Sequence, residues 1–195
     1  MNCLVYGFHG LFWAAFLVRA FRPRGAEAPA GPAPAARQPR AARHPAFLLF
    51  FHGIGFGAMY AALGRAVLAP IPTGTLFDLP WPVGGLVILL GAALLAWALW
   101  VFGSWRLLAK LDADHRLCTQ GPYRHFRHPI YVACDLLAIG TFLWIPTLGM
   151  LFALILMLLG GHLRARAEEK LLLGIFGEEY RVYCRATKRY VPRLF

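Results

Sequence analysis

The run 129-PIYVACDLLAIGTFLWIPTLGMLFALILMLLGGHL-163 is the longest apolar stretch of the chain, and its length decides how the fold is read. It has 35 residues and a single charge, Asp135. As one helix, at about 1.5 Å per residue, it would be about 52 Å long, whereas the hydrocarbon core of a bilayer is about 30 Å thick. Pro146, within Trp144-Ile-Pro-Thr-Leu-Gly149, cannot continue a helix without loss of a hydrogen bond. The run therefore predicts a hairpin of two short transmembrane helices.

Three earlier apolar runs each have the length for one crossing, which takes about 20 residues in a helix. They are Cys3–Val18, Ala46–Ala69 and Trp81–Trp105. Together with the hairpin they predict an all-α integral membrane protein with five transmembrane helices, in which spans four and five are the hairpin. A cytoplasmic C-terminal helical tail is expected to follow.

The composition excludes several other classes of protein. Hydrophobic residues make up 59% of the 195 residues, charged residues only 15%, and the mean hydropathy is +0.56. Soluble domains average about 45–50% apolar and about 25% charged residues. A soluble nucleic-acid-binding protein would explain the net charge of +11 but not so few charges. The four cysteines lie far apart and form no CxxC pair, which argues against a disulfide-stapled or zinc-binding domain.

The basic residues predict the orientation of the spans. Of the 20 Lys and Arg residues, 19 lie in three segments: between spans one and two, between spans three and four, and after Leu163. With five spans these segments share one face, which the positive-inside rule assigns to the cytoplasm, so the N-terminus is expected outside. The first run has its positive charges after the apolar core, at Arg19 to Arg24, so we do not interpret it as a cleavable signal peptide.

A dense polar segment precedes the hairpin. Residues 115–131 contain three His, three Arg and two Tyr, and Pro129 within them is suited to the first turn of a helix. The free N–H groups of that turn would attract an anion, and Tyr123, Arg127 and His128 could surround a carboxylate there. An interfacial collar of snorkelling side chains is the alternative. No metal is expected, because His125 and His128 lie beside arginines that would repel a cation.

A second polar segment, residues 164–180, follows the hairpin. Arg164 and Glu168 are four residues apart and so share a helix face. They form either an exposed ion pair or a cation and carboxylate held where span five meets the cytosol. Glu178 and Glu179 are expected to begin a new helix after Gly177, where they favour its dipole.

Four of the polar residues within the predicted spans are interpreted individually. Asp135 lies one turn beyond Tyr131 on about the same face, where it could line a site or make a buried polar contact. Arg65 is expected to snorkel to the nearer surface. His9 and His52 are expected to pack or to form hydrogen bonds between helices rather than to bind a ligand.

The two polar segments, taken in order, resemble the isoprenylcysteine carboxyl methyltransferase family and its bacterial relatives. The resemblance covers about the last 80 residues, whereas spans one to three match only in hydropathy. The matching features are Gly121-Pro-Tyr123, Arg127-His-Pro-Ile-Tyr131, Arg164, Glu168-Glu169, Phe176-Gly-Glu-Glu-Tyr180, Tyr183 and Val191-Pro-Arg193.

The resemblance implies S-adenosyl-L-methionine as the methyl donor, and it implies the residues that bind it. The family's cofactor-binding positions correspond here to His115, Arg116, Leu117, Cys118, Tyr123, His128, Pro129, Ile130 and Tyr131. The family's substrate-side Arg and Glu correspond to Arg164 and Glu168, which we take as the candidate catalytic and substrate-binding pair. Asp135 is a further candidate for substrate binding.

We therefore expect a single membrane domain over residues 1–195. Residues 1–105 would hold spans one to three with a flexible cytoplasmic loop at 23–45, and residues 106–195 the cofactor-binding loop, the hairpin and the tail. The resemblance implies methylation of a lipophilic or lipid-tailed acceptor, foremost carboxyl O-methylation of an isoprenylcysteine-like substrate, in the inner (cytoplasmic) membrane of a bacterium. Phospholipid N-methylation, a sterol-reductase-like enzyme using NADPH and a non-catalytic lipid-binding protein are the alternatives.

Overall fold

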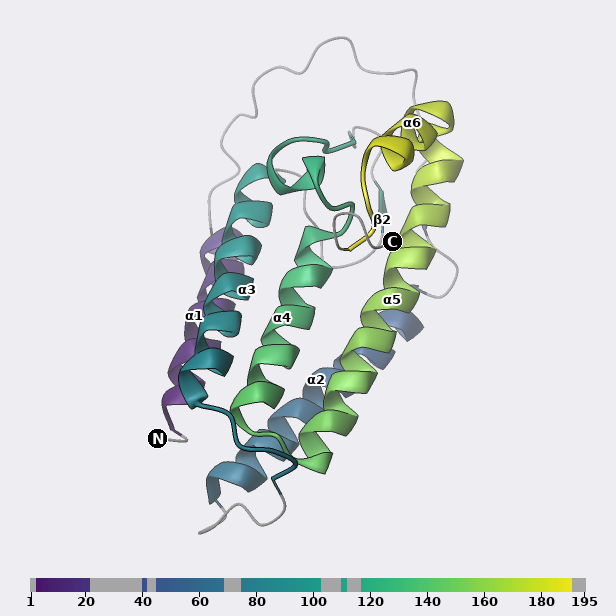
Figure 1. The fold of residues 1–195 in the computed structure, drawn as a ribbon. Helices are drawn as coiled ribbons and strands as arrows, with labels where there is room; N and C mark the ends of the chain where they lie inside the picture. The colour runs from purple at the N-terminus through teal and green to yellow at the C-terminus, as the bar shows by residue number, and fades with distance from the viewer. Residues whose placement is uncertain are drawn as a thin grey trace.

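The computed structural model describes residues 3–21, 40–41, 45–68, 75–102, 110–111 and 117–190, and its long helices form a bundle (Figure 1). The α-helices are α1 (Leu4–Phe21), α2 (Pro45–Leu68), α3 (Trp81–Val101), α4 (Pro129–Trp144), α5 (Leu148–Phe176) and α6 (Glu178–Ala186). A 3₁₀ helix, η1, covers Gly121–Arg124. Helix α4 packs between α3 and α5, while α1 packs against α3 and α2 against α5.

The three earlier apolar runs form one helix each and the run 129–163 forms two, all at nearly their predicted positions. Among the described residues, α3 and α5 are long and apolar enough to cross a membrane, whereas the apolar helices Leu4–Val18 and Pro129–Trp144 are shorter. The helical architecture is thus confirmed, and five membrane crossings stay a prediction. Many large apolar side chains point away from the bundle, among them Leu11, Trp100 and Phe152, which are 60%, 70% and 59% exposed. An apolar outer surface of this kind is typical of contact with lipid.

The predicted turn of the hairpin is confirmed at Pro146. Helix α4 ends at Trp144 and α5 begins at Leu148, after Thr147 accepts a hydrogen bond from the N–H of Met150 at 3.3 Å. The Pro146 carbonyl accepts a hydrogen bond from the N–H of Leu76 at 2.7 Å, which ties the turn to the segment before α3. Helix α5 then continues past Leu163 to Phe176, so the polar segment that begins at Arg164 lies on the same helix as the apolar one.

A short strand pair was not predicted from the sequence. Arg40–Ala41 (β1) pairs antiparallel with Lys110–Leu111 (β2). Arg40 and Ala41 fall within the segment 23–45 that we predicted to be a flexible loop, and the rest of that segment up to residue 44 lies outside the described residues. Two residues per strand are too few for any alternating pattern to show in the sequence.

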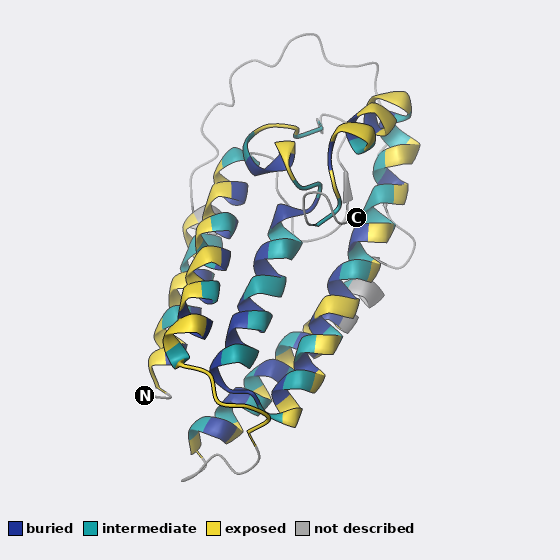
Figure 2. Cartoon of the chain, in the orientation of Figure 1, coloured by how far each residue is buried: buried dark blue, intermediate teal, exposed yellow. Residues whose placement is uncertain are grey.

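The core is continuous through the bundle, and α4 is its most buried helix (Figure 2). Glycines allow α3 and α4 to approach closely, as in many membrane helix pairs. A Cβ atom on Gly84 would lie 2.5 Å from the carbonyl oxygen of Gly140, and one on Gly140 would lie 2.7 Å from the carbonyl oxygen of Gly84. These contacts involve backbone on both sides, so a side chain at either position must push the helices apart.

A chain of hydrogen bonds connects α1, α2 and α4 inside the bundle. Trp13 Nε1 donates to the Tyr60 hydroxyl, which lies 2.9 Å from His9 Nδ1, while His9 Nε2 lies 2.9 Å from Thr141 Oγ1. Thr141 donates to the carbonyl of Leu137 at 2.6 Å, so His9 Nε2 is the donor to Thr141 and Tyr60 is the donor to His9. Every ring nitrogen of His9 therefore has a partner, and the expected interhelical role of His9 is confirmed.

We predict that Gly84→Ala destabilises the protein by about 1–3 kcal/mol, because the added methyl group meets the backbone of α4. Thermal unfolding of the purified protein in detergent measures the effect. Gly57→Ala in α2 is the matched control, since a Cβ there has no atom within 4 Å. This control should be neutral or stabilising by up to about 1 kcal/mol. Equal effects of the two substitutions would contradict the close approach of α3 and α4.

Candidate active site

The two polar segments that the sequence singled out meet at one end of the bundle. The 3₁₀ helix η1, the beginning of α4, the last turns of α5 and the helix α6 lie together there, opposite the end at which α1 begins (Figure 1). The structure thus brings together residues that are about 40 positions apart in the sequence.

The segment Gly121-Pro-Tyr123 is held against the end of α3. Gly121 has a φ of +56°, and a Cβ there would lie 2.8 Å from Val101, so only glycine fits this turn without strain. Tyr123 is buried, and its carbonyl accepts a hydrogen bond from the Tyr183 hydroxyl at 2.7 Å. Burial raises the pKa of the Tyr123 hydroxyl well above its usual range. This hydroxyl has no hydrogen-bond partner among the described residues.

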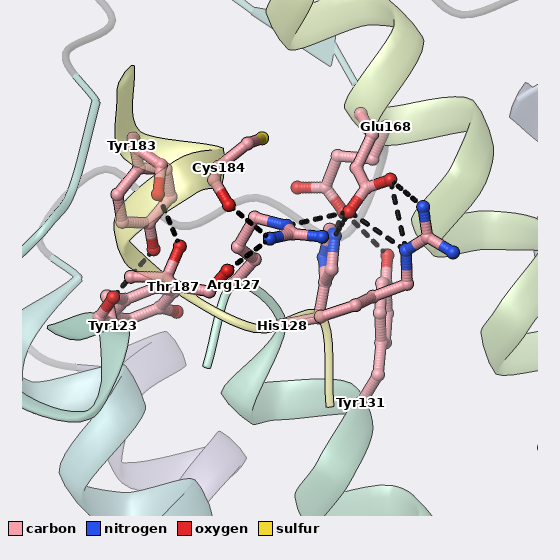
Figure 3. Close-up of polar contacts among 10 residues, drawn as sticks. Tyr123, Arg127, His128, Tyr131, Glu168, Tyr183, Cys184 and Thr187 are labelled. Atoms are coloured by element: carbon pink, nitrogen blue, oxygen red, sulfur yellow. Dashed lines mark hydrogen bonds and ion pairs between the residues drawn. The ribbon is translucent and has the colours of Figure 1, made fainter. Parts of the chain in front are cut away.

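Arg127 binds a carboxylate of the chain itself, so the bound carboxylate that we expected between Tyr123, Arg127 and His128 stays a prediction. Its Nε donates to Glu169 Oε1 at 2.9 Å, and its Nη1 donates to the carbonyls of Cys184 and Thr187 (Figure 3). The backbone N–H of Arg127 donates to the carbonyl of Lys188 at 2.8 Å. Arg127 therefore joins the start of α4 to α5 and to the residues after α6.

Glu169 is the common partner of these contacts. Its carboxylate accepts hydrogen bonds from Arg127, from Arg189 and, at 3.4 Å, from His128 Nε2. Glu169 lies beyond the apolar part of α5. Burial raises the pKa of its carboxyl, but the hydrogen bonds from His128, Arg189 and Arg127 outweigh this effect and hold that pKa well below its usual range. Our sequence interpretation noted the Glu168-Glu169 pair but did not assign Glu169 or Arg189 to the site.

Glu168 faces the other candidate residues. The Tyr131 hydroxyl donates to Glu168 Oε2 at 3.0 Å, and His128 Nδ1 lies 3.7 Å from the same oxygen. The rings of His128 and Tyr131 stack, with centroids 5.5 Å apart and planes inclined by 17°. The guanidinium carbon of Arg164 lies 5.3 Å from the centroid of the Tyr131 ring. The structure thus places Tyr131 against both members of the Arg164–Glu168 pair.

His52 of α2 also reaches this group of residues. Arg164 Nη1 lies 3.5 Å from His52 Nδ1, and the His52 and Tyr131 ring centroids are 6.3 Å apart. The interhelical contact expected for His52 is confirmed. Its place beside Arg164 and Tyr131 was not predicted, because α2 is apolar on all sides and its sequence does not indicate which face meets α5.

Asp135 lies one turn further along α4, as the sequence predicted. Its Oδ1 atom is buried and has no hydrogen-bond partner among the described residues. The same atom would lie 3.5 Å from a Cβ on Gly161, so it faces α5. Burial raises the pKa of the Tyr190 hydroxyl above its usual range, and the charge of Asp135 adds to this effect.

The other predicted cofactor-binding residues have more varied surroundings. Leu117 packs against a small apolar cluster of α5 and α6, and Cys118 is half-buried. Pro129 is buried in the first turn of α4, and Ile130 packs against the main core. His115 and Arg116 lie outside the described residues. Within the described ranges, no group of three or more His, Cys, Asp or Glu side chains could hold a metal ion.

Comparison with known proteins identifies the family. The profile of a family described as phospholipid methyltransferase matches residues 80–179, which contain most of this site. The chain belongs to that family. It is accordingly a membrane methyltransferase, and the family membership decides against the reductase and the non-catalytic alternatives.

A curated relative is similar over a shorter region. The chain is 33% identical over 86 residues to a protein-S-isoprenylcysteine O-methyltransferase from Schizosaccharomyces pombe. The alignment covers 43% of this chain and 36% of that protein, so the chain spans about a third of the length of the curated relative that it matches. The predicted resemblance is thereby confirmed.

We predict that Glu169→Gln at pH 7 lowers the free energy of unfolding by about 1.5–3 kcal/mol, because Arg127 and Arg189 lose a charged partner. A carboxyl whose pKa is lowered in the folded protein stabilises it above the unfolded pKa of 4.5, and this contribution is lost as the pH falls further toward the folded pKa. The difference between wild type and variant should therefore shrink below about pH 4.5.

Denaturant unfolding of both proteins at several pH values measures this difference. Glu178→Gln is the matched control, since Glu178 is exposed on α6 and contacts only Arg181 and Arg185 among the described residues. This control should change stability little at any pH. A Glu169→Gln variant as stable as wild type at pH 7 would show that Glu169 does not hold the site together.

Proposed function

We propose that the chain transfers a methyl group from S-adenosyl-L-methionine to a lipid-tailed acceptor, and that the reaction is carboxyl O-methylation of an isoprenylcysteine-like substrate. The observation that carries this proposal is the placement of Tyr131 between Arg164 and Glu168, with distances of 5.3 Å to the guanidinium and 3.0 Å to the carboxylate. The name of the yeast relative supports the acceptor class.

The charges around Tyr131 suit two different ligands. Arg164 can pair with an acceptor carboxylate through two parallel hydrogen bonds. Glu168 and the ring of Tyr131 offer a carboxylate and a π-face to a cation such as a sulfonium. Since a carboxylate acceptor has no proton to lose, Glu168 need not act as a base, and its role is to position Tyr131 and to balance the positive charge of the donor.

The residues near the start of α4 fit S-adenosyl-L-methionine, which supplies an activated methyl group on a sulfonium. His128 precedes the helix and forms no side-chain cap, so N–H groups of the first turn are available to a carboxylate. The Tyr123 hydroxyl is buried without a partner among the described residues and can bond a polar group of the donor. We propose that Tyr123, His128 and Tyr131 hold the donor, and that Arg164 orients the acceptor.

The same proposal includes the arrangement in the membrane. Five crossings with the N-terminus outside would place this end of the bundle at the cytoplasmic surface of an inner membrane, where a water-soluble donor is available. The lipid tail of the acceptor would reach the site sideways from the bilayer.

Phospholipid N-methylation is the second candidate, and the description of the matching family favours it. An ethanolamine head carries a phosphate that Arg164 could bind and an amine that would have to lose a proton before methylation. For this reaction Glu168 could serve as the base.

We predict that S-adenosylhomocysteine raises the melting temperature of the purified protein and that NADPH does not. Tyr131→Ala should weaken S-adenosylhomocysteine binding about tenfold or more, because it removes the ring against His128 and the hydrogen bond to Glu168. Arg65→Ala is the control, because Arg65 is exposed in the last turn of α2. This variant should bind S-adenosylhomocysteine as tightly as wild type. Isothermal titration measures both affinities, and equal losses would place the donor elsewhere.

We predict that Arg164→Gln raises KM for a carboxylate acceptor about tenfold or more while the affinity for S-adenosylhomocysteine stays the same. Arg166→Gln is the matched control, since Arg166 lies on the same turn of α5 but is exposed. Labelled methyl transfer to N-acetyl-S-farnesylcysteine provides the rates. A loss of donor affinity in Arg164→Gln without a change in acceptor KM would assign Arg164 to the donor instead.

A further inference from the structure

One ring nitrogen of His52 forms no hydrogen bond with any described residue. Arginine only donates hydrogen bonds, so the contact of Arg164 Nη1 with His52 Nδ1 makes Nδ1 the acceptor. In the neutral ring the proton then resides on Nε2, which becomes a donor. Nε2 is buried and has no partner among the described residues. His52 therefore presents a buried N–H that no described residue accepts.

Asp135 presents the opposite kind of group. Its Oδ1 is a buried acceptor without a donor, and no cation among the described residues is paired with it. Burying a carboxyl group within an apolar helix costs free energy, so such a residue indicates a functional site. His52 and Asp135 thus give the bundle a buried donor and a buried acceptor that no described residue satisfies. Trp144 Nε1 is a further such donor, at the end of α4 away from Tyr131.

The two groups flank the same point of α5. A Cβ on Gly160 would lie 3.0–3.3 Å from atoms of His52, and a Cβ on the next residue, Gly161, would lie 3.5 Å from Asp135 Oδ1. Both groups also neighbour Tyr131: the His52 ring is 6.3 Å from its ring, and Asp135 follows one turn later on α4. They therefore lie immediately beyond the Tyr131 contacts to Arg164 and Glu168, toward the apolar interior.

His9 shows that this bundle satisfies a buried histidine when the role is structural. Both ring nitrogens of His9 have partners at 2.9 Å, and the chain of bonds ends on a backbone carbonyl. The different treatment of His52 indicates that its partner is a ligand. His52 also precedes the residues matched by the family profile, so its assignment does not follow from the family.

We propose that His52 and Asp135 form a two-point site for the polar head of the acceptor: His52 Nε2–H donates to an anionic oxygen of the head, and Asp135 accepts from an N–H of the same head. This inference rests on the proposed function and adds the head-group chemistry to it. Arg164, beside His52, adds a positive charge that attracts the same anionic oxygen. The amido-carboxylate of an isoprenylcysteine and the phosphate with ammonium of a phosphoethanolamine lipid share this chemistry.

The test compares pairs of ligands in which one member lacks the group that carries the N–H. One pair is N-acetyl-S-farnesylcysteine and S-farnesylthiopropionate, and the other is phosphatidylethanolamine and phosphatidylethanol. Affinities for the purified full chain are measured by thermal stabilisation, with and without S-adenosylhomocysteine. Wild type should bind the N–H-bearing member of at least one pair about tenfold more tightly.

The variants separate the two points of the site. Asp135→Ala should bring the preference within about twofold, whereas His52→Phe should weaken both members of the pair and leave their ratio unchanged. Asp135→Asn keeps an acceptor oxygen but no charge, so it should preserve a preference for an amide N–H and lose one for an ammonium. This variant distinguishes the two sources of the head group, and it remains informative if Asp135→Ala folds poorly.

His9→Phe is the matched control, since it removes a buried histidine that has both partners. It should lower the melting temperature of the ligand-free protein without changing either affinity ratio, whereas Asp135→Ala should leave that temperature unchanged or raise it. Failure of wild type to discriminate within either pair, or an unchanged preference in Asp135→Ala, would overturn the inference. Absence of S-adenosylhomocysteine binding would count against the proposed function alone, because the paired comparison is also made without it.

Discussion

The carboxylate of Glu169 is the interaction on which the rest of the candidate site depends. It accepts hydrogen bonds from Arg127 and His128 at the start of α4 and from Arg189 after α6. The carboxylate of Glu169 therefore connects α5 to the start of α4 and to the segment after α6, and it offsets positive charge of Arg127 and Arg189. Because Arg127 and His128 are fixed in this way, the stacked ring of Tyr131 is fixed as well, while the side chain of His128 does not cap the first turn of α4.

The membrane environment makes polar groups in the bundle informative. In an apolar surrounding an unpaired donor or acceptor costs free energy that water cannot offset. In the chain of hydrogen bonds from Trp13 to Thr141, both ring nitrogens of His9 have partners, and this chain joins three helices. His52 and Asp135 each have a buried polar atom without a partner among the described residues, and both adjoin α5 next to Tyr131. The contrast separates polar residues that hold helices together from those that we assign to a ligand.

Much of the fold could be predicted from hydropathy and from helix start and stop signals. Hydropathy located the five long helices, Pro146 located the turn, and Gly177 with Glu178 located the start of α6. The contact between Tyr131 and Glu168 was also foreshadowed by the two polar segments. The role of His52 was not, because an apolar helix gives no sign of how it is rotated about its axis. The β1–β2 pair was missed because two residues carry no periodicity.

Glu168 and Glu169 are neighbours in the sequence but have different partners in the structure, which the sequence alone does not predict. Consecutive residues of a helix project about 100° apart, so the two carboxylates cannot serve the same partners. The spacing of four predicts that Glu168 shares a helix face with Arg164, and in the structure both side chains contact Tyr131. It does not reveal that Glu169 meets Arg127, because that contact depends on how α5 is rotated against α4. Helix α5 thus carries Glu169, which holds the site together, beside Glu168, which we assign to the chemistry of the site. Only the packing of α4 against α5 distinguishes these two roles.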